Sequence, residues 1–360
     1  MLLMKPICKL TLGIILLLWQ GTQAYAQVNA PKHFYKILVG KINEQLPIRV
    51  VLTKSRLPEN LKGNVFGSYY YTKIKSGEIN LEGVWKDNGE VTLKELYGKF
   101  SGRWNSVNKV LVGMWTSKDG KKAFPFRLYE KYEEGSIQAE MVYLDQKTVM
   151  GAKAPQWTDA WILYPKFKGG KPGVVNKINQ FVQEKILLKN PEEIIRSQVE
   201  EQVQHKKIAG RKSTHEKTIK ILHNKNNVLT LVAVDDPTYE GNYRSFIMVS
   251  YYSFDLNTGQ QFQLEDIFIE GAQAKIQPLI VTQFRKDKKL KAGKSLKTEG
   301  FFNEDFAVAR NFYFSLKGVF FFYGIREICY YYAGPQATTI PYNKLKKYIK
   351  KGSPLDRYLR

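Results

Sequence analysis

Short segments rich in aromatic and β-branched residues recur about every ten residues through the first half of the chain. Examples are GNVFGSYYYTK, GEINLEGVWK, GEVTLKELYG and NKVLVGMWT, and Gly, Asn, Asp or Ser separates them. The turns KDNGE and SKDGKK carry Asn-Gly and Asp-Gly, which suit the positive φ angles of tight hairpins. This spacing predicts an all-β domain, an antiparallel meander that forms a small barrel or a sandwich.

Two kinds of residue inside these segments bear on whether the domain is a barrel and whether it holds a ligand. Gly83, Gly102 and Gly113 fit bends or bulges where the sheet of a barrel turns. Alternating aromatic residues suit either an ordinary core or the lining of a ligand cup, as in lipocalin-like carriers, and both interpretations stay open. The residues that would line such a barrel are Tyr69, Tyr71, Trp85, Trp104 and Trp115.

The N-terminus predicts a secretory signal peptide over residues 1–26. Lys5 and Lys9 precede an apolar run from Leu10 to Trp19, and an Ala-Tyr-Ala sequence ends at Ala26. The apolar run is short for a membrane span, which needs about 20 residues. We therefore expect cleavage after Ala26 and a periplasmic or secreted protein that does not span a membrane after cleavage.

The cysteine content indicates a fold that is stabilised by hydrophobic cores and not by disulfide bonds. Cys8 would leave with the signal peptide, so Cys329 would be left without an internal disulfide partner. Because Cys329 lies between apolar neighbours in ICYYYAG, we predict a buried, unreactive thiol.

The character of the sequence changes at APQWTDAWILYPKFKGGKPG, where prolines and a Gly-Gly pair surround a short apolar strand. We place a domain boundary there, with an all-β domain over residues 27–151 and a second domain over residues 152–360. The Pro- and Gly-rich composition predicts a linker or hinge between the two.

The second half mixes helices with strands. Apolar residues at helical spacing predict helices over KPGVVNKINQFVQEKIL and residues 272–289, and Asn190 and Pro191 begin another. Strands are predicted at EKTIKILHN, NVLTLVAVDD and YRSFIMVSYYSFDL, followed by a hairpin in NFYFSLKGVFFFYG. EICYYYAGP is predicted as the next strand, and a last helix follows Pro341. This order favours an α+β domain with an antiparallel sheet.

Three stretches of this half resemble the RsiV-like extracellular domain family. They are WILYPKFKGGKPGVVNKINQFVQEKI, FDLNTGQQFQLEDIF and GVFFFYGIREICYYYAGPQATTIPYNKLKKYI, within about residues 158–352. The family occurs in a lysozyme-sensing anti-sigma factor and beside the catalytic domain of PdaC-type peptidoglycan deacetylases. The resemblance implies a non-catalytic α+β domain of the cell envelope. One departure is the region VDDPTYEGNYRSF, which lacks the Gly-Gly-Ala-His stretch often present in the family.

No catalytic or metal-binding pattern is evident. Sequences such as G-x-S-x-G and H-E-x-x-H are absent. His205, His215 and His223 lie close together in sequence, but no cysteine joins them, and Asp235-Asp236 is interpreted as the end of a strand. We predict no catalytic residues, no metal and no cofactor, while an enzyme hidden from such patterns stays an open alternative.

The charge of the chain favours an anionic partner. Lys and Arg outnumber Asp and Glu by 56 to 33, a formal net charge of +23. The leading hypothesis is an exported binding protein for an anionic envelope polymer or an acidic protein, with basic lysozyme disfavoured by charge. Export makes nucleic acid an improbable partner. The alternatives are a cell-wall hydrolase or deacetylase-associated enzyme, and a lipocalin-like carrier. The candidate binding residues are Tyr239, Asn242, Tyr243, Arg244, Arg285, Lys286, Lys288 and Lys289.

Overall fold

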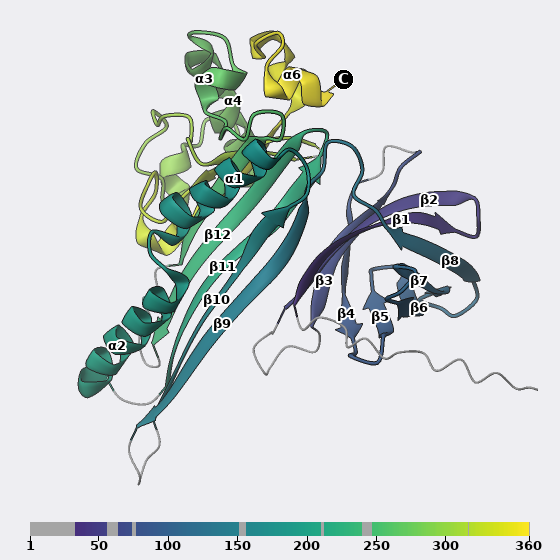
Figure 1. Ribbon diagram of the computed structural model, residues 1–360. Helices are drawn as coiled ribbons and strands as arrows, with labels where there is room; N and C mark the ends of the chain where they lie inside the picture. The colour runs from purple at the N-terminus through teal and green to yellow at the C-terminus, as the bar shows by residue number, and fades with distance from the viewer. Residues whose placement is uncertain are drawn as a thin grey trace, which may run out of the picture.

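Eight antiparallel strands of the first half close into a barrel (Figure 1). β1 pairs with β8 from Leu38 opposite Glu130 to Ile42 opposite Phe126, which joins the two ends of the sheet. The all-β prediction is therefore confirmed, and the fold is a barrel rather than a sandwich. The strands are β1 Phe34–Ile42, β2 Leu46–Lys54, β3 Val65–Tyr71, β4 Ile79–Trp85, β5 Glu90–Lys94, β6 Gly98–Asn105, β7 Val110–Ser117 and β8 Ala123–Glu130.

The structure is a computed structural model that describes residues 33–55, 64–73, 77–150, 156–209, 212–239, 247–315 and 317–359. The predicted signal peptide lies outside these residues. Within them, no helix combines the length and apolar character that crossing a membrane requires.

A five-stranded sheet follows the barrel, in the order β13-β12-β11-β10-β9. β10 and β11 are parallel, and the connection between them is helical, with two α-helices joined by a π-helix. These helices cover one side of the sheet and the barrel lies on the other (Figure 1). The elements are β9 Gln138–Met150, β10 Gln156–Lys168, α1 Pro172–Phe181, the π-helix Val182–Leu187, α2 Pro191–Ala209, β11 Lys212–Lys225, β12 Val228–Tyr239 and β13 Met248–Asp255.

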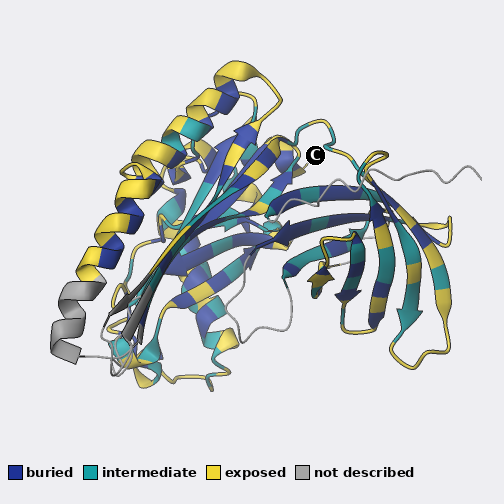
Figure 2. Cartoon of the chain, turned by 60° about the horizontal axis from the view of Figure 1, so that its bottom comes forward, coloured by how far each residue is buried: buried dark blue, intermediate teal, exposed yellow. Residues whose placement is uncertain are grey.

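The covering helices form because their apolar residues repeat at helical spacing. Val174, Val175 and Ile178 of α1 are buried against the sheet, and the outward face of the helices is exposed (Figure 2). As predicted, Asn190 caps α2, since its side-chain oxygen accepts the backbone N–H of Glu192 at 2.9 Å.

The barrel ends, and the five-stranded sheet begins, earlier in the chain than the predicted boundary at residues 151–152. β9 pairs with β10 from Gln138 to Met150, so residues 138–150 belong to the second sheet. The connection that leaves the barrel is therefore residues 131–137. Alternating apolar residues in β9 look the same as those of a barrel strand, and the sequence does not show which partner the strand takes.

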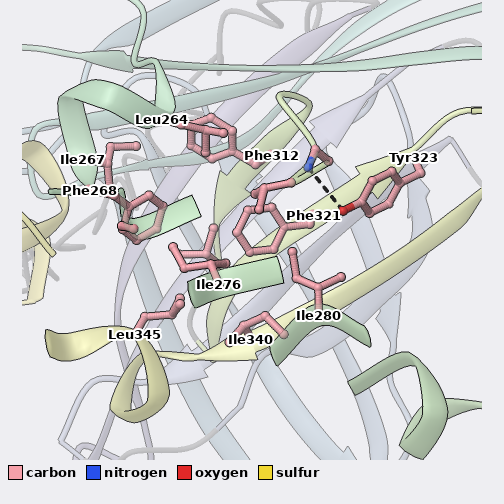
Figure 3. Packing of buried hydrophobic residues seen from close by; sticks show 14 of the residues in the cluster. Leu264, Ile267, Phe268, Ile276, Ile280, Phe312, Phe321, Tyr323, Ile340 and Leu345 are labelled. Carbon is pink, nitrogen blue, oxygen red and sulfur yellow. Dashed lines mark hydrogen bonds between the residues drawn. The ribbon is translucent and has the colours of Figure 1, made fainter. Parts of the chain in front are cut away.

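The last part of the chain is a small three-stranded sheet with helices packed against it. Ile276 and Ile280 of one helix meet Phe321 of the sheet in a fully buried core (Figure 3). The Tyr323 hydroxyl accepts the backbone N–H of Ala309 at 3.2 Å within this core. The elements are α3 Leu264–Ile267, α4 Ala272–Asp287, the 3-10 helix Leu296–Glu299, β14 Phe312–Phe314, β15 Gly318–Tyr323, the 3-10 helix Tyr331–Ala333, β16 Gln336–Pro341, α5 Tyr342–Leu345, the 3-10 helix Lys346–Tyr348 and α6 Pro354–Leu359. The α+β prediction is confirmed.

One predicted element of this part is wrong. EICYYYAGP is not a strand, because only an isolated bridge joins Cys329 to Phe301 and a short 3-10 helix follows. Arg326 and Gly334 adopt positive φ angles of 64° and 67°, which an extended strand does not accommodate. The consequence is that consecutive tyrosines are presented on a turn instead of alternating between the two faces of a sheet.

Candidate functional site

The exposed turn at Tyr330–Tyr332 carries the most prominent group of aromatic side chains on the surface of the last part. Tyr332 and Tyr330 are 77% and 54% exposed, and Phe302 is 40% exposed. The rings of Tyr330 and Tyr332 are parallel to within 7°, with centroids 5.9 Å apart, and Phe302 meets Tyr330 edge-on at 4.9 Å. Exposed apolar groups gathered in this way mark interaction sites on soluble proteins.

Local backbone features hold these rings in place. Gly300 has a φ of 84°, and a Cβ atom there would lie 2.9 Å from the Tyr332 ring. The backbone N–H of Tyr330 donates to the carbonyl of Gly300 at 2.8 Å. Any side chain at residue 300 would therefore displace Tyr332, so the glycine is what allows the ring to lie against the backbone.

A lysine-rich segment adjoins the aromatic turn. The positive charge of Lys288 acts on Cys329, and the 3-10 helix Leu296–Glu299 leads directly to Gly300 under Tyr332. On the far side, the Arg326 guanidinium lies 5.6 Å from the centre of the Tyr331 ring. We call this surface the aromatic–basic face and define it as Phe302, Tyr330, Tyr332, Lys286, Lys288, Lys289, Lys291, Lys294 and Lys297.

The predicted binding residue Arg285 forms a two-pronged ion pair within the chain. Its guanidinium donates to both carboxylate oxygens of Glu304, at 2.8 and 2.7 Å. Glu304 also accepts the backbone N–H of Leu296 at 2.6 Å and the Ser295 hydroxyl at 3.0 Å. The N–H of Leu296, together with Arg285 and Ser295, lowers the pKa of Glu304. Arg285 thus links the end of α4 to the lysine-rich loop through Glu304.

The other predicted binding residues divide into two groups. Lys286 and Lys289 are exposed at the end of α4 and Lys288 is half-buried, so these lysines belong to the aromatic–basic face. Asn242, Tyr243 and Arg244 lie outside the described residues, and for Tyr239 only the backbone is described, at the end of β12. Of the predicted binding residues, only the three lysines, which are also neighbours in the sequence, thus fall within the residues that define the aromatic–basic face.

Cys329 lies beneath the aromatic–basic face and is buried, as predicted. Burial raises the pKa of its thiol, which donates to the carbonyl oxygen of Gly334 at 3.0 Å. The thiol therefore helps to close the turn that presents the tyrosines.

The five aromatic residues predicted to line the barrel all lie in or beside its core. Tyr69, Trp85 and Trp104 are buried, whereas Tyr71 and Trp115 are only partly buried. The rings of Trp85 and Trp104 lie 5.4 Å apart, and Tyr69 meets Phe100 edge-on at 5.4 Å. Ring-to-ring packing of this kind makes Tyr69, Trp85 and Trp104 part of the barrel core, whereas Tyr71 and Trp115 lie at its edge.

Polar contacts between the barrel and the five-stranded sheet converge on Arg49 of β2. This residue is 4% exposed, and it donates to Glu133 at 2.8 Å and to the backbone carbonyl of Asn224 at 2.7 Å. The Asn224 side chain in turn forms two hydrogen bonds with the backbone of Ile137, at 2.8 and 2.6 Å. We call Arg49, Glu133, Ile137 and Asn224 the interdomain junction.

His223 is next to Asn224 of this junction. Its ring packs edge-on against Tyr358 of α6, with centroids 5.3 Å apart. Burial, and then the positive charge of Arg49, lowers the pKa of His223 to about 4. The imidazole of His223 is therefore neutral in the folded protein at neutral pH.

We predict that the free energy of unfolding decreases as pH falls from 6.5 to about 4. Unfolded chains take up a proton on His223 near pH 6.5, whereas the folded protein resists it until about pH 4. The stabilisation is complete above pH 6.5 and is lost progressively below it, by roughly 2 kcal/mol, since one pKa unit corresponds to about 1.4 kcal/mol and the ring keeps some contact with solvent. Urea unfolding at pH 7 and 4.5 measures the change. A His223→Gln variant is the control, and an equal decrease in both proteins would contradict the prediction.

Another polar cluster lies within the sheet, on β11 and β12. Asp235 accepts from His215 at 2.6 Å and from Lys217 at 3.2 Å. Asp235 and Asp236 lie inside β12 instead of ending a strand, because β12 continues to Tyr239. In the part of the chain that the structure describes, no group of three or more His, Cys, Asp or Glu side chains is arranged to hold a metal ion.

Phe302, Tyr330 and Tyr332 are the residues that sequence reasoning missed. Tyr330 and Tyr332 lie in EICYYYAGP, which is predicted as a strand because aromatic residues favour strands, and no prediction covers Phe302. The signal that points to the turn is the succession of three tyrosines before Gly334-Pro335, since a strand can turn only alternate side chains to one face.

Comparison with known proteins finds one family model that matches a segment of the chain. Residues 265–343 match the family model "Protein of unknown function (DUF3298)". A search of curated proteins finds no match. Phe302, Tyr330, Tyr332 and the lysine-rich segment all fall within the matched residues.

Two crystal structures of DUF3298 family proteins resemble this chain. One, from Bacteroides fragilis, is 18% identical, covers 62% of this chain and 99% of its own, and has a TM-score of 0.50. Another, from Pseudomonas aeruginosa PAO1, is 13% identical, covers 60% of this chain and 97% of its own, and has a TM-score of 0.43. The first likeness shows a shared fold that extends beyond residues 265–343. The aromatic–basic face is thus part of a DUF3298 domain, which this chain carries over residues 265–343.

Proposed function

We propose that this chain is an exported protein of the cell envelope that binds an anionic glycan or polymer through the aromatic–basic face. The observation that carries the proposal is the fixed pair of parallel, exposed rings of Tyr330 and Tyr332 beside a lysine-rich loop. Flat aromatic faces pack against the apolar C–H faces of sugar rings, and their hydroxyl groups reach the sugar hydroxyls. Lysines beside such rings add attraction for phosphate or carboxylate groups on the same polymer.

Charge supports an anionic partner over a basic one. Lys286, Lys289 and Lys291 are exposed, and the whole chain carries a formal charge of +23. A surface of one sign raises the local concentration of oppositely charged polymers and slows the approach of proteins of the same sign. Basic lysozyme, the partner that the RsiV-like resemblance suggests, is therefore disfavoured.

A binding role accounts for the nearby carboxylates better than acid–base catalysis does. Glu304 is held by Arg285 and the N–H of Leu296, and Glu327 accepts the backbone N–H of Gly324 at 2.7 Å. Both carboxylates thus stabilise the loops that present the rings. A hydrolase would need a pair of carboxylates placed to transfer protons at the scissile bond.

The test is binding of the full mature chain to a polyglycerol-phosphate polymer and to lipopolysaccharide, measured by calorimetry at low and physiological salt. We expect binding that weakens at physiological salt, because salt screens exposed charges. The double variant Tyr330→Ala/Tyr332→Ala should bind at least about tenfold more weakly, with an unchanged melting temperature, since loss of two stacking contacts corresponds to 1.4 kcal/mol or more.

A Tyr129→Ala variant is the matched control, because Tyr129 is also exposed, at 47%, but lies on the barrel. The control should bind like the wild-type protein. Unchanged affinity in the Tyr330/Tyr332 variant would overturn the assignment of this face. Salt-resistant binding to lysozyme, with none to the two polymers, would overturn the proposed class of partner.

A further inference from the structure

One end of the barrel carries a ring of partly exposed aromatic side chains. β3 ends at Tyr71, Trp115 lies near the end of β7, and Phe124 lies near the start of β8. Trp115 and Phe124 are opposite each other in the β7–β8 pair, and their rings are parallel to within 9° with centroids 6.0 Å apart. All three side chains pack against the barrel core but are only partly buried, so their outer faces meet the solvent.

The carboxylate of Glu95 lies beside the ring of Trp115. Glu95 follows β5 at the same end of the barrel, and it accepts the indole N–H of Trp115 at 3.1 Å and the backbone N–H of Tyr97 at 2.6 Å. The hydroxyl of Tyr69, deeper in the barrel, hydrogen-bonds with Tyr71 and Glu95. The burial of Tyr69, with Tyr71 and Glu95 beside it, raises its pKa. The carboxylate is thus oriented by neutral donors.

No lysine or arginine of the described residues forms an ion pair with Glu95, although elsewhere the barrel pairs its carboxylates in this way. At the opposite end, Lys36 pairs with Glu130 at 2.6 Å and lies 4.7 Å from the centre of the Trp104 ring. That end therefore already contains a cation that contacts a carboxylate and an aromatic face. At the Glu95 end the carboxylate and the aromatic faces are present, and among the described residues no lysine or arginine is ion-paired with that carboxylate.

The geometry points to a binding site for a small organic cation, an ammonium group, at this end of the barrel. The faces of aromatic rings carry negative potential and attract ammonium groups within about 6 Å, most strongly when a carboxylate supplies the opposite charge. A metal ion does not suit the site, because it would need several oxygen ligands and only one carboxylate is present. An anion is disfavoured by Glu95. This site differs in place and in charge preference from the aromatic–basic face.

The experiment titrates the full mature chain with choline and with its neutral isostere 3,3-dimethylbutan-1-ol, following the indole N–H signal of Trp115 by NMR. Choline has the same shape as the alcohol and differs in charge. We expect choline to shift the Trp115 signal saturably and to bind at least about tenfold more tightly than the alcohol. Equal binding of the two compounds, or no binding of choline, would overturn the inference.

Variants at the site separate charge from shape. Glu95→Gln keeps the shape of the side chain and removes the charge, so it should weaken choline binding about tenfold and leave binding of the alcohol unchanged. Phe124→Leu removes one aromatic face and should weaken choline binding several-fold, and Tyr129→Leu on the barrel exterior is the control for both. Melting temperatures establish that the variants are folded. Choline affinity that is the same in folded Glu95→Gln and wild-type protein would refute a cation site.

Discussion

Replacing Gly113 with alanine is expected to lower the free energy of unfolding by about 3 kcal/mol, the upper end of the usual cost of forcing extra atoms into a closely packed position. Gly113 of β7 pairs with Gly102 of β6 in the barrel wall. A Cβ atom at residue 113 would lie 2.1 Å from the carbonyl oxygen of Ser101 and 2.5 Å from the Cα of Gly102. Both are backbone atoms, so the two strands would have to separate. Urea unfolding followed by circular dichroism measures the loss.

Gly173→Ala is the matched control for this substitution. A Cβ atom at Gly173, in the first turn of α1, would meet no atom within 4 Å. We expect an unchanged free energy of unfolding or a gain of up to about 1 kcal/mol, since alanine favours helices more than glycine does. If Gly113→Ala were as stable as Gly173→Ala, the close approach of β6 and β7 would be wrong.

Replacing Arg49 with methionine is expected to destabilise the protein by about 2 kcal/mol, because it removes the buried guanidinium and leaves the partly exposed Glu133 and the buried Asn224 carbonyl without their donor. Methionine preserves much of the side-chain volume. The same substitution should raise the pKa of His223 above about 4, because the positive charge of Arg49 is one of the causes of its lowered value. Urea unfolding gives the first quantity and NMR titration of the imidazole gives the second.

The Lys86→Met variant tests whether the loss of stability in Arg49→Met is specific to the interdomain junction. Lys86 pairs with Glu90 at 2.8 Å on the barrel surface, where both side chains are well exposed. Exposed pairs contribute at most about 1 kcal/mol, so this variant should remain close to the wild-type protein. An Arg49→Met protein that unfolds like Lys86→Met, with an unshifted His223 pKa, would show that the junction contributes little.

Local patterns in the sequence predicted most of the elements and the fold classes. Helices such as α1 and α4 follow from apolar residues at helical spacing, and the hairpin of β14 and β15 follows from its turn at Lys317-Gly318. The structure shows close strand approach at Gly83 and Gly113, where a Cβ atom would meet the carbonyl of a neighbouring strand at 1.9 and 2.1 Å, while the bends predicted there stay a prediction. Each of these features is decided by residues close together in the chain.

Features that depend on distant residues could not be predicted. Arg49 meets Asn224 across 175 positions of sequence, and no local pattern marks either residue as a partner. β9 has the alternation of a barrel strand but pairs with β10. The exposure of Tyr332 depends on its contact with Gly300 and on the turns at Arg326 and Gly334. The candidate lysines could be predicted because charge is visible in the sequence, whereas Tyr330 and Tyr332 lie in a segment predicted as a strand.

The membership of β9 in the second sheet has a practical consequence for anyone dividing the chain. A fragment cut after residue 151 would contain the closed barrel followed by a long strand whose pairing partner has been removed. Unpaired backbone N–H and C=O groups along such a strand invite pairing with a second molecule and hence aggregation. Cutting within residues 131–137 instead would leave the barrel with all its strands paired and the strand with its own sheet.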